Sequence, residues 1–281
     1  MRGQRMRFED ADAEYLASHQ EPWILSAEDD WHGFENIEED YVMLDPIKLT
    51  IMTPGIAQDG SLEDDGIPAL IVSRFLAEYH VVCEKADYYS FLMLNSIGTD
   101  ASKQDALLAA MDAFCTAYEK NRPIAEVLPK LSESFPKNYG SIGLADHCRT
   151  MHRFFRKNDM LKTMQLACAK VPEPIMPPSK AYENIVRNNV ERVELKNASG
   201  RTAAAMIVPY PPGIPLIMGG EILAEDQPVY RYLKLLEDFE NSFPGYEMEI
   251  HGIQKKRKNG RTQFFLLCVK DAVSLGNNAK M

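Results

Sequence analysis

One carboxylate stands out among the residues whose chemistry could serve a reaction. Glu84 follows the apolar run Val81 to Cys83 and precedes Lys85, which predicts a short strand at 81–84 that ends on a charge. A carboxylate at the end of a strand can point into a cleft and bind an amine or another cation. A carboxylate in that position is more often a solvated strand end. The residues alone leave both interpretations open.

Histidine and cysteine occur together once, on a helix predicted to begin near residue 144. His147 and His152 are five residues apart, whereas two ligands on one helical face need a spacing of three or four. Cys148 falls on the apolar face of the same helix. Core packing is therefore favoured over a metal site.

Two further segments are candidate sites. His32 stands between Trp31 and Gly33, a combination that suits a shaped pocket and equally suits a packed loop. The segment Lys255–Arg261 carries five basic residues and could attract phosphate or an acidic partner. In an acidic protein it is as readily the solvated tip of a hairpin.

Familiar catalytic strings do not occur in this sequence. It contains no G-x-S-x-G elbow, no Walker phosphate-binding loop, no H-E-x-x-H and no G-x-G-x-x-G. The residues therefore predict an α/β protein in two parts without a self-sufficient active site.

Composition narrows the class of partner and the compartment. The chain has 281 residues, 45% of them hydrophobic, and a net charge of −10, which argues against general binding to nucleic acid or to anionic membranes. No apolar run approaches the ~20 residues that span a bilayer, and the basic amino end has no apolar core typical of a secretory signal. The five cysteines show no C-x-x-C spacing, which favours reduced thiols in the cytoplasm.

Composition and apolar patterning divide the chain into three stretches. Residues 1–30 are polar and are expected to form a remnant or mobile arm, residues 31–130 a small α/β domain, and residues 131–281 a second domain. Pro129 and Pro136 mark the expected junction. The first domain is predicted to contain strands at 41–44, 49–53, 81–84 and 90–97, one helix that begins near 68, and another after 98.

The second domain begins with helices in 144–169 and 181–187. Strands at 190–195 and 202–208 are predicted to form a hairpin across Asn197–Gly200. A helix at 228–242 precedes strands at 247–253 and 263–269 that flank the basic loop.

The most unusual string is Val208–Glu221, with four prolines and three glycines in an apolar run. Neither a helix nor a long central strand can pass through it. It predicts a buried corner with positive φ at Gly213 and a short strand at 214–218.

Taken in order, nine strings resemble the carboxy-terminal part of the bacterial ornithine/lysine/arginine decarboxylases, and most nearly the inducible lysine decarboxylases. The resemblance spans about residues 31–270. The strings are Trp31–Phe34, Leu44–Thr50, Thr53–Gly55, Gly66–Ala69, Val82–Lys85, Ser96–Gly98, Val127–Pro129, Pro209–Pro215 and Phe243–Gly245.

The resemblance implies a fold and a cofactor. It implies the small α/β domain of fold-type I pyridoxal phosphate (PLP) enzymes followed by the α+β carboxy-terminal domain of this family. In the family PLP binds in a large domain, amino-terminal to these residues, on the lysine of a Ser-x-His-Lys motif. This sequence has no His-Lys dipeptide. We therefore expect that domain to be absent, with no catalytic or cofactor-binding residue in this chain.

The resemblance also assigns roles and partners. It implies that Glu84 faces the PLP site and orients the distal ammonium of the substrate, with Trp31, His32 and Thr53 as weaker candidates. Nucleotide regulation around Asn121–Gly143 is not expected. The implied partners are an amino-terminal PLP-binding half and other subunits of an oligomer, and the implied reaction is decarboxylation of lysine to cadaverine.

Several alternatives remain open from the sequence. The substrate could be arginine or ornithine. The chain could be a non-catalytic module that associates with intact decarboxylase oligomers, or the product of an interrupted gene.

Overall fold

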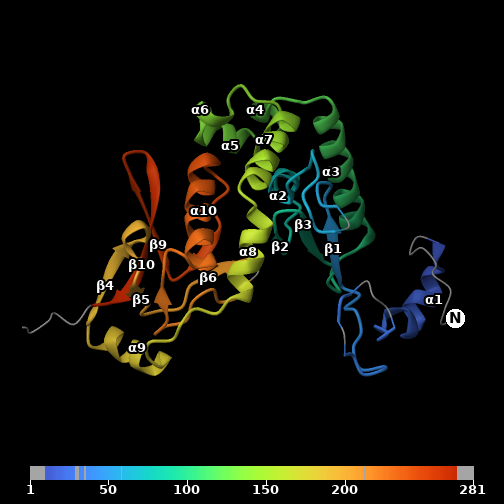
Figure 1. Ribbon diagram of the computed structural model, residues 1–281. Coiled ribbons are helices and arrows are strands. Elements are labelled where there is room, and N and C mark those ends of the chain that lie inside the picture. The colour runs from blue at the N-terminus through green and yellow to red at the C-terminus, as the bar shows by residue number, and fades with distance from the viewer. Residues whose placement is uncertain (1–9, 29–31, 35, 58, 212, 271–281) are drawn as a thin grey trace, which may run out of the picture.

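The amino-terminal part of the computed structural model is built on a small antiparallel sheet of strand order β1-β3-β2 (Figure 1). The structure describes residues 10–28, 32–34, 36–57, 59–211 and 213–270. Helix α2 packs against the sheet and α3 packs against α2. The elements are β1 (Lys48–Met52), α2 (Ala69–Glu78), β2 (Lys85–Ala86), β3 (Ser90–Leu94) and α3 (Ala101–Glu119).

The helices of this part form where their apolar residues repeat at helical spacing. Helix α2 begins after Pro68, as predicted, and buries one apolar face from Ile71 to Leu76, whereas Tyr79, expected on the same face, is exposed. The apolar spacing of α3 predicts one face that contains both Leu108 and Phe114. Phe114 is buried, but Leu108 is exposed, and Ala110 and Ala117 are buried instead.

The segment that precedes the sheet lies away from the rest of the molecule (Figure 1, blue). It contains α1 (Ala13–Ser18), capped by the Asp12 carboxylate, and the 3-10 helix η2 (Glu21–Trp23). The strand predicted at 41–44 is reduced to an isolated bridge between Met43 and Ile24. Backbone hydrogen bonds of this stretch run to Trp23 and Leu25.

Short helices occupy the stretch that its prolines had marked as a junction. Pro129 and Pro136 each stand at the first position of a helix, where a missing N–H and a fixed φ are favourable. The predicted helices of 144–169 are confirmed as α7 and α8. The helices here are α4 (Ile124–Val127), α5 (Pro129–Ser134), α6 (Pro136–Tyr139), α7 (Leu144–Lys157) and α8 (Met160–Ala169).

The carboxy-terminal part contains one three-stranded sheet, of order β4-β10-β9, and two strand pairs, β5-β7 and β6-β8, all antiparallel. The helix predicted at 228–242 is confirmed as α10. The elements are α9 (Pro178–Val186), β4 (Val190–Glu194), η3 (Leu195–Asn197), β5 (Arg201–Thr202), β6 (Val208–Tyr210), β7 (Ile222–Leu223), α10 (Pro228–Ser242), β8 (Glu249–His251), β9 (Ile253–Lys258) and β10 (Arg261–Val269).

The structure corrects two predicted connections in this part, although the basic segment does lie in a hairpin, between β9 and β10. The hairpin across Asn197–Gly200 does not form, because β4 pairs with β10 and β5 pairs with β7. The basic loop is mostly strand: Lys255 to Lys258 belong to β9, and only Asn259-Gly260, both at positive φ, make the turn.

The string Val208–Glu221 forms a corner, as predicted. Gly213 takes a φ of +82°, and the Tyr210–Pro211 peptide is cis. The predicted strand at 214–218 is wrong, since only Ile217 bridges to Ile207 and no ladder follows. Pro215 has no N–H to donate, which removes one bond that a ladder would need.

A single cluster of buried apolar side chains runs from Ala69 to Cys268 and so through both predicted domains. Helices α7, α8 and α10 stand between the amino-terminal and the carboxy-terminal sheets (Figure 1). The boundary at residue 130 stays a prediction, but the core is shared across it.

Candidate functional site

Glu84 lies at the end of the amino-terminal sheet, immediately before β2. The strand predicted at 81–84 is wrong, because β2 contains only Lys85 and Ala86. The Glu84 N–H donates to the carbonyl of Leu92 on β3 at 2.9 Å, which fixes its backbone beside that strand. Its side chain is exposed to solvent. A carboxylate held in this way is available to a cationic ligand from outside the chain.

The other candidate residues lie apart from Glu84. The Thr53 N–H donates to the carbonyl of Tyr89, the residue just before β3, at 2.9 Å. The carbonyls that hold Thr53 and Glu84 are three residues apart, which corresponds to ~10 Å along a strand. The Thr53 hydroxyl is buried without a hydrogen-bond partner among the described residues.

His32 is held by its own loop. Its Nε2 lies 2.9 Å from the Ser26 carbonyl, and its Nδ1 accepts from the Phe34 N–H at 3.1 Å. These contacts require a neutral ring with the proton on Nε2. Trp31 lies outside the described residues. Both of these hydrogen bonds stay within residues 26–34, away from the sheet that carries Glu84 and Thr53.

The two histidines of α7 each bind a tyrosine from another part of the chain. His152 accepts from the Tyr89 hydroxyl at 2.6 Å through Nδ1, and its Nε2 donates to the Glu63 carbonyl at 2.9 Å. His147 Nε2 lies 3.0 Å from the Tyr246 hydroxyl, and burial lowers the pKa of His147 to about 4. Both histidines therefore tie distant segments to α7.

The neighbouring cysteine packs as the sequence predicted. Cys148 is fully buried between the two histidines, and burial raises its pKa to about 12. Among the described residues no group of three or more histidine, cysteine, aspartate or glutamate side chains could hold a metal ion. The helix serves packing in this structure.

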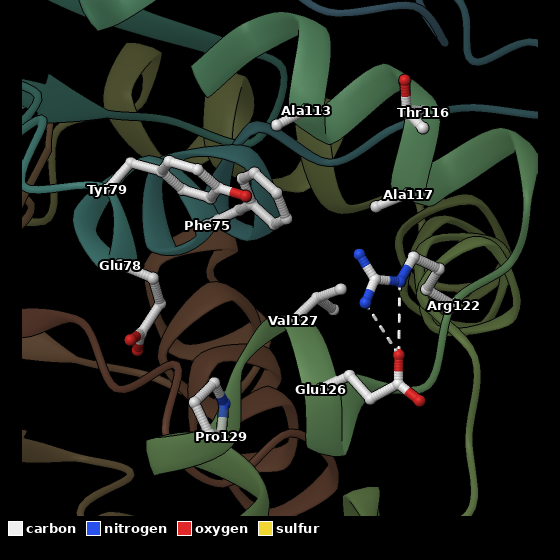
Figure 2. Close-up of a pocket in the computed structure, with 10 residues that line it drawn as sticks. All are labelled: Phe75, Glu78, Tyr79, Ala113, Thr116, Ala117, Arg122, Glu126, Val127 and Pro129. Carbon is white, nitrogen blue, oxygen red and sulfur yellow. Dashed lines mark hydrogen bonds and ion pairs between the residues drawn. The ribbon is translucent and has the colours of Figure 1, made fainter. Parts of the chain in front are cut away.

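A surface hollow of about 310 Å³ lies between α2, α3 and α4 (Figure 2). Phe75, Val127 and Pro129 contribute apolar walls. Arg122 faces the hollow, but its guanidinium is paired with Glu126 at 2.9 Å. The hollow overlaps the stretch in which nucleotide regulation is not expected, and that expectation stays a prediction.

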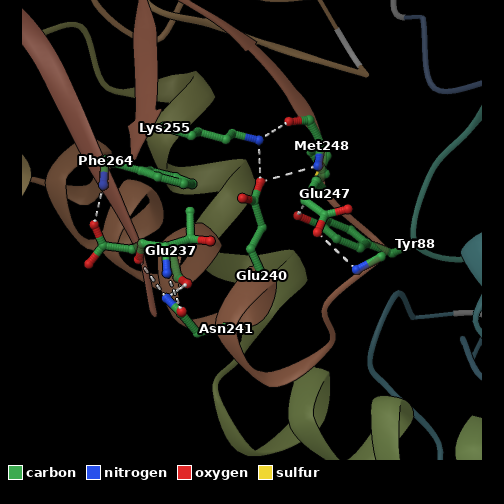
Figure 3. Close-up of polar contacts among 10 residues, drawn as sticks. Tyr88, Glu237, Glu240, Asn241, Glu247, Met248, Lys255 and Phe264 are labelled. Atoms are coloured by element: carbon green, nitrogen blue, oxygen red, sulfur yellow. Dashed lines mark hydrogen bonds and ion pairs between the residues drawn. The ribbon is translucent and has the colours of Figure 1, made fainter. Parts of the chain in front are cut away.

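Glu240 on α10 forms a buried ion pair with Lys255 of β9 (Figure 3). The Glu240 side chain is fully excluded from solvent, and it also accepts from the Met248 N–H at 3.2 Å. Lys255 donates in addition to the Met248 carbonyl. Burial raises the pKa of Glu240, and Lys255 opposes that rise. The pair fixes β9 on α10.

The residues present do not fit a PLP site. The sequence offers no His-Lys dipeptide, and Lys255, whose side chain is only 25% exposed, is already bound to Glu240.

The buried pairs of Tyr89 with His152 and of Lys255 with Glu240 were missed by sequence reasoning. No spacing rule links residues 63 or 15 positions apart. Near Tyr89 the sequence offered only the strings that resemble a known family. Those strings did not predict the contact between Tyr89 and His152.

No helix among the described residues is long and apolar enough to cross a membrane.

Two family models match this chain in order. The model described as Orn/Lys/Arg decarboxylase, major domain, matches residues 4–103, and Orn/Lys/Arg decarboxylase, C-terminal domain, matches residues 161–270. Lysine decarboxylase LdcA of Pseudomonas aeruginosa is 43% identical over 89% of this chain and 33% of its own length. The biodegradative arginine decarboxylase of Escherichia coli is 35% identical over 90% of this chain and 34% of its own length.

Solved structures agree with the sequence matches. Lysine decarboxylase A from Pseudomonas aeruginosa superposes with a TM-score of 0.82 at 42% identity, covering 89% of this chain and 34% of that one. The constitutive lysine decarboxylase of E. coli gives 0.80 at 36% identity, covering 88% and 35%. The mixed α/β fold is thereby confirmed, and the chain spans about one third of the length of the relatives it matches. This chain belongs to the Orn/Lys/Arg decarboxylase family.

Proposed function

We propose that this chain supplies the carboxy-terminal portion of a PLP-dependent basic amino-acid decarboxylase that converts lysine to cadaverine. The observation that carries the proposal is the ordered match of two domains of one family to a chain that covers 33% of LdcA. In such an enzyme PLP stabilises the carbanion left by loss of CO₂. The PLP-binding half must therefore come from outside the residues present here.

The identities favour lysine among the three substrates of the family. Relatives named as lysine decarboxylases match at 43%, 38% and 37%, whereas relatives named as arginine and ornithine decarboxylases match at 35%. The five cysteines are free thiols in the structure, which supports a cytoplasmic location. We also propose that such subunits assemble into an oligomer.

Glu84 is the residue of this chain to which we assign a role in substrate binding. A carboxylate that receives a charge-assisted hydrogen bond from the distal ammonium of lysine would fix the length and orientation of the substrate. Its exposed side chain and fixed backbone support this role. Thr53 and His32 remain the weaker candidates, since only the Thr53 backbone is bonded and the His32 ring is held within its own loop.

The test is reconstitution of activity. The chain with PLP alone is expected to release no CO₂ from lysine and to show no visible absorption of bound PLP. Co-expression with the part of LdcA that this chain does not cover is expected to restore lysine-dependent CO₂ release. Activity of the chain alone would refute the need for a second half.

A matched pair of variants tests Glu84. Glu84→Gln in the reconstituted enzyme should raise KM for lysine and lower kcat/KM by about 10- to 100-fold, the value of one hydrogen bond to a charged group. Glu183→Gln is the control, at a half-exposed glutamate on α9 that pairs with Lys180. Equal kinetics for the two variants would remove Glu84 from the site.

The alternatives give different results in the same system. A non-catalytic assembly module would co-purify with full-length LdcA and would not restore activity to the incomplete one. The product of an interrupted gene would do neither. A Ser-x-His-Lys string in the reading frame immediately upstream would support the split enzyme.

A further inference from the structure

Apolar side chains gather on the surface at one end of the amino-terminal sheet. More exposed large apolar residues lie in the stretch 34–97 than in all the rest of the described chain. Five of them surround the place where β1 begins and β3 ends, and we call these five the sheet-end patch. They are Ile47, Leu49, Val82, Leu94 and Ile97, with exposed fractions from 41% to 111%.

Backbone contacts place these residues together. The Asn95 N–H donates to the carbonyl of Ile47 at 2.7 Å, so the residue before β1 lies beside the residue after β3. Leu49 is paired with Met93, next to Leu94. Val82 lies two residues before Glu84, whose N–H is bonded to Leu92. The five residues therefore surround one end of the sheet, with Ile47 and Leu49 on one face and Leu94, which pairs with Lys48, on the other.

A surface of this kind needs an explanation. Single exposed apolar residues are ordinary, but several that adjoin one another mark a contact with another molecule or segment. Strand β1 is also an edge strand, since the described sheet has the order β1-β3-β2. Its free edge offers unpaired backbone groups beside the patch.

The position of the patch identifies what covers it. All five residues lie within 4–103, the stretch that matches the major domain of the family, and none lies within 161–270. The relatives that carry this major domain are three times as long as the matched region, since the chain covers 33% of LdcA. The patch thus belongs to the domain of which this chain holds only a part.

We infer that the sheet-end patch is the surface on which the amino-terminal PLP-binding half docks, with Glu84 at the edge of the contact. The inference rests on the proposed function. Glu84 is exposed in this chain and lies two residues after Val82. Covering the patch would withdraw water from around Glu84 and strengthen its attraction for a substrate ammonium. The docking surface and the substrate site would then form in one step.

The test measures association separately from catalysis. The probe is the part of LdcA that this chain does not cover, tagged and co-expressed with the full 281-residue chain. Val82→Lys/Ile97→Lys places two charges in the patch at positions of high exposure, so the fold of the free chain should persist. Val171→Lys/Val186→Lys is the matched control, with similarly exposed valines outside the patch. Circular dichroism and the thermal midpoint verify folding of each variant.

We expect the patch variant to weaken association by at least about 100-fold, the effect of losing two buried aliphatic side chains, and the control to bind as the wild type does. Equal binding by patch variant and control would overturn the inference. Patch-dependent self-association of the chain, without binding of the LdcA part, would assign the surface to a second copy and would also overturn it.

The two proposals can fail independently. A complex that forms in a patch-dependent way yet releases no CO₂ from lysine would leave the docking surface standing and refute the proposed function. An active complex that is insensitive to the patch variant would do the reverse.

Discussion

Replacing Lys255 by methionine should destabilise the carboxy-terminal part strongly. The change keeps the length of the side chain but leaves the Glu240 carboxylate in a place that solvent does not reach. One of its oxygens, Oε2, already lacks a hydrogen-bond partner among the described residues. The other would keep only the N–H of Met248 at 3.2 Å.

The magnitude follows from the cost of an unpaired buried charge. Removing one partner of a buried pair typically costs about 3–5 kcal/mol. Burial raises the pKa of Glu240 above 4.5 even with Lys255 present, and loss of the lysine would raise it further. Because the pKa of Glu240 is raised in the folded state, its contribution to stability is complete below pH 4.5. That contribution is lost as the pH rises through the folded-state pKa. The cost of the variant should therefore be small at acid pH and grow by about 1.4 kcal/mol per pH unit up to that value.

Chemical unfolding followed by circular dichroism at pH 4, 5.5 and 7 measures this difference. The control is Glu240→Gln/Lys255→Met, which removes both charges and keeps an acceptor for Met248. It should recover most of the lost stability, because replacing a buried pair by neutral groups is often close to neutral. A loss below about 1 kcal/mol at pH 7, or a loss that does not vary with pH, would refute the reasoning.

Two further predictions concern stability. The pKa of His147 is lowered to about 4 by burial, so the unfolded chain takes up a proton near 6.5 that the folded chain refuses, and stability should fall by about 3 kcal/mol between pH 6.5 and 4. His147→Phe should lack this dependence although it loses the bond to Tyr246, and parallel pH profiles for the two proteins would contradict the assignment. Gly220→Ala should cost more than about 2 kcal/mol, because φ is +97° and a Cβ would lie 2.1 Å from the Met176 carbonyl oxygen. Gly60→Ala, at φ +82° with nothing within 4 Å, should cost only about 1 kcal/mol by the same unfolding measurement, and similar losses would show that the close contact relaxes.

Local sequence signals located the elements that stand on their own periodicity. Helix α10 begins at Pro228 and ends at Ser242, as its apolar spacing predicted, and α2 follows Pro68 for the same reason. Sequence signals whose meaning depends on the tertiary context led to wrong predictions. Pro129 reads equally as a linker residue and as the start of a helix, and only its packing selects the second. Gly200 suggested a hairpin, but β5, the strand after it, pairs with β7.

The candidate site was predictable only as a position in the chain. The nine strings along the chain indicated the family, and the family alone gave the Glu84 carboxylate a proposed role. Whether the carboxylate is buried, exposed or engaged could not follow from its neighbours in sequence, because burial is set by segments that fold against it.

The sequence by itself determined the family, the mixed α/β class and the helices whose apolar faces repeat within a few residues. The tertiary structure decided which strands pair and that the sheet-end patch is exposed. It also decided that His152 binds Tyr89 and that Glu240 and Lys255 form a buried ion pair. The physical reason is range. Helical periodicity is written in residues three and four apart, whereas strand partners, buried pairs and exposed surfaces depend on contacts between residues far apart in the chain. Only folding brings those residues together.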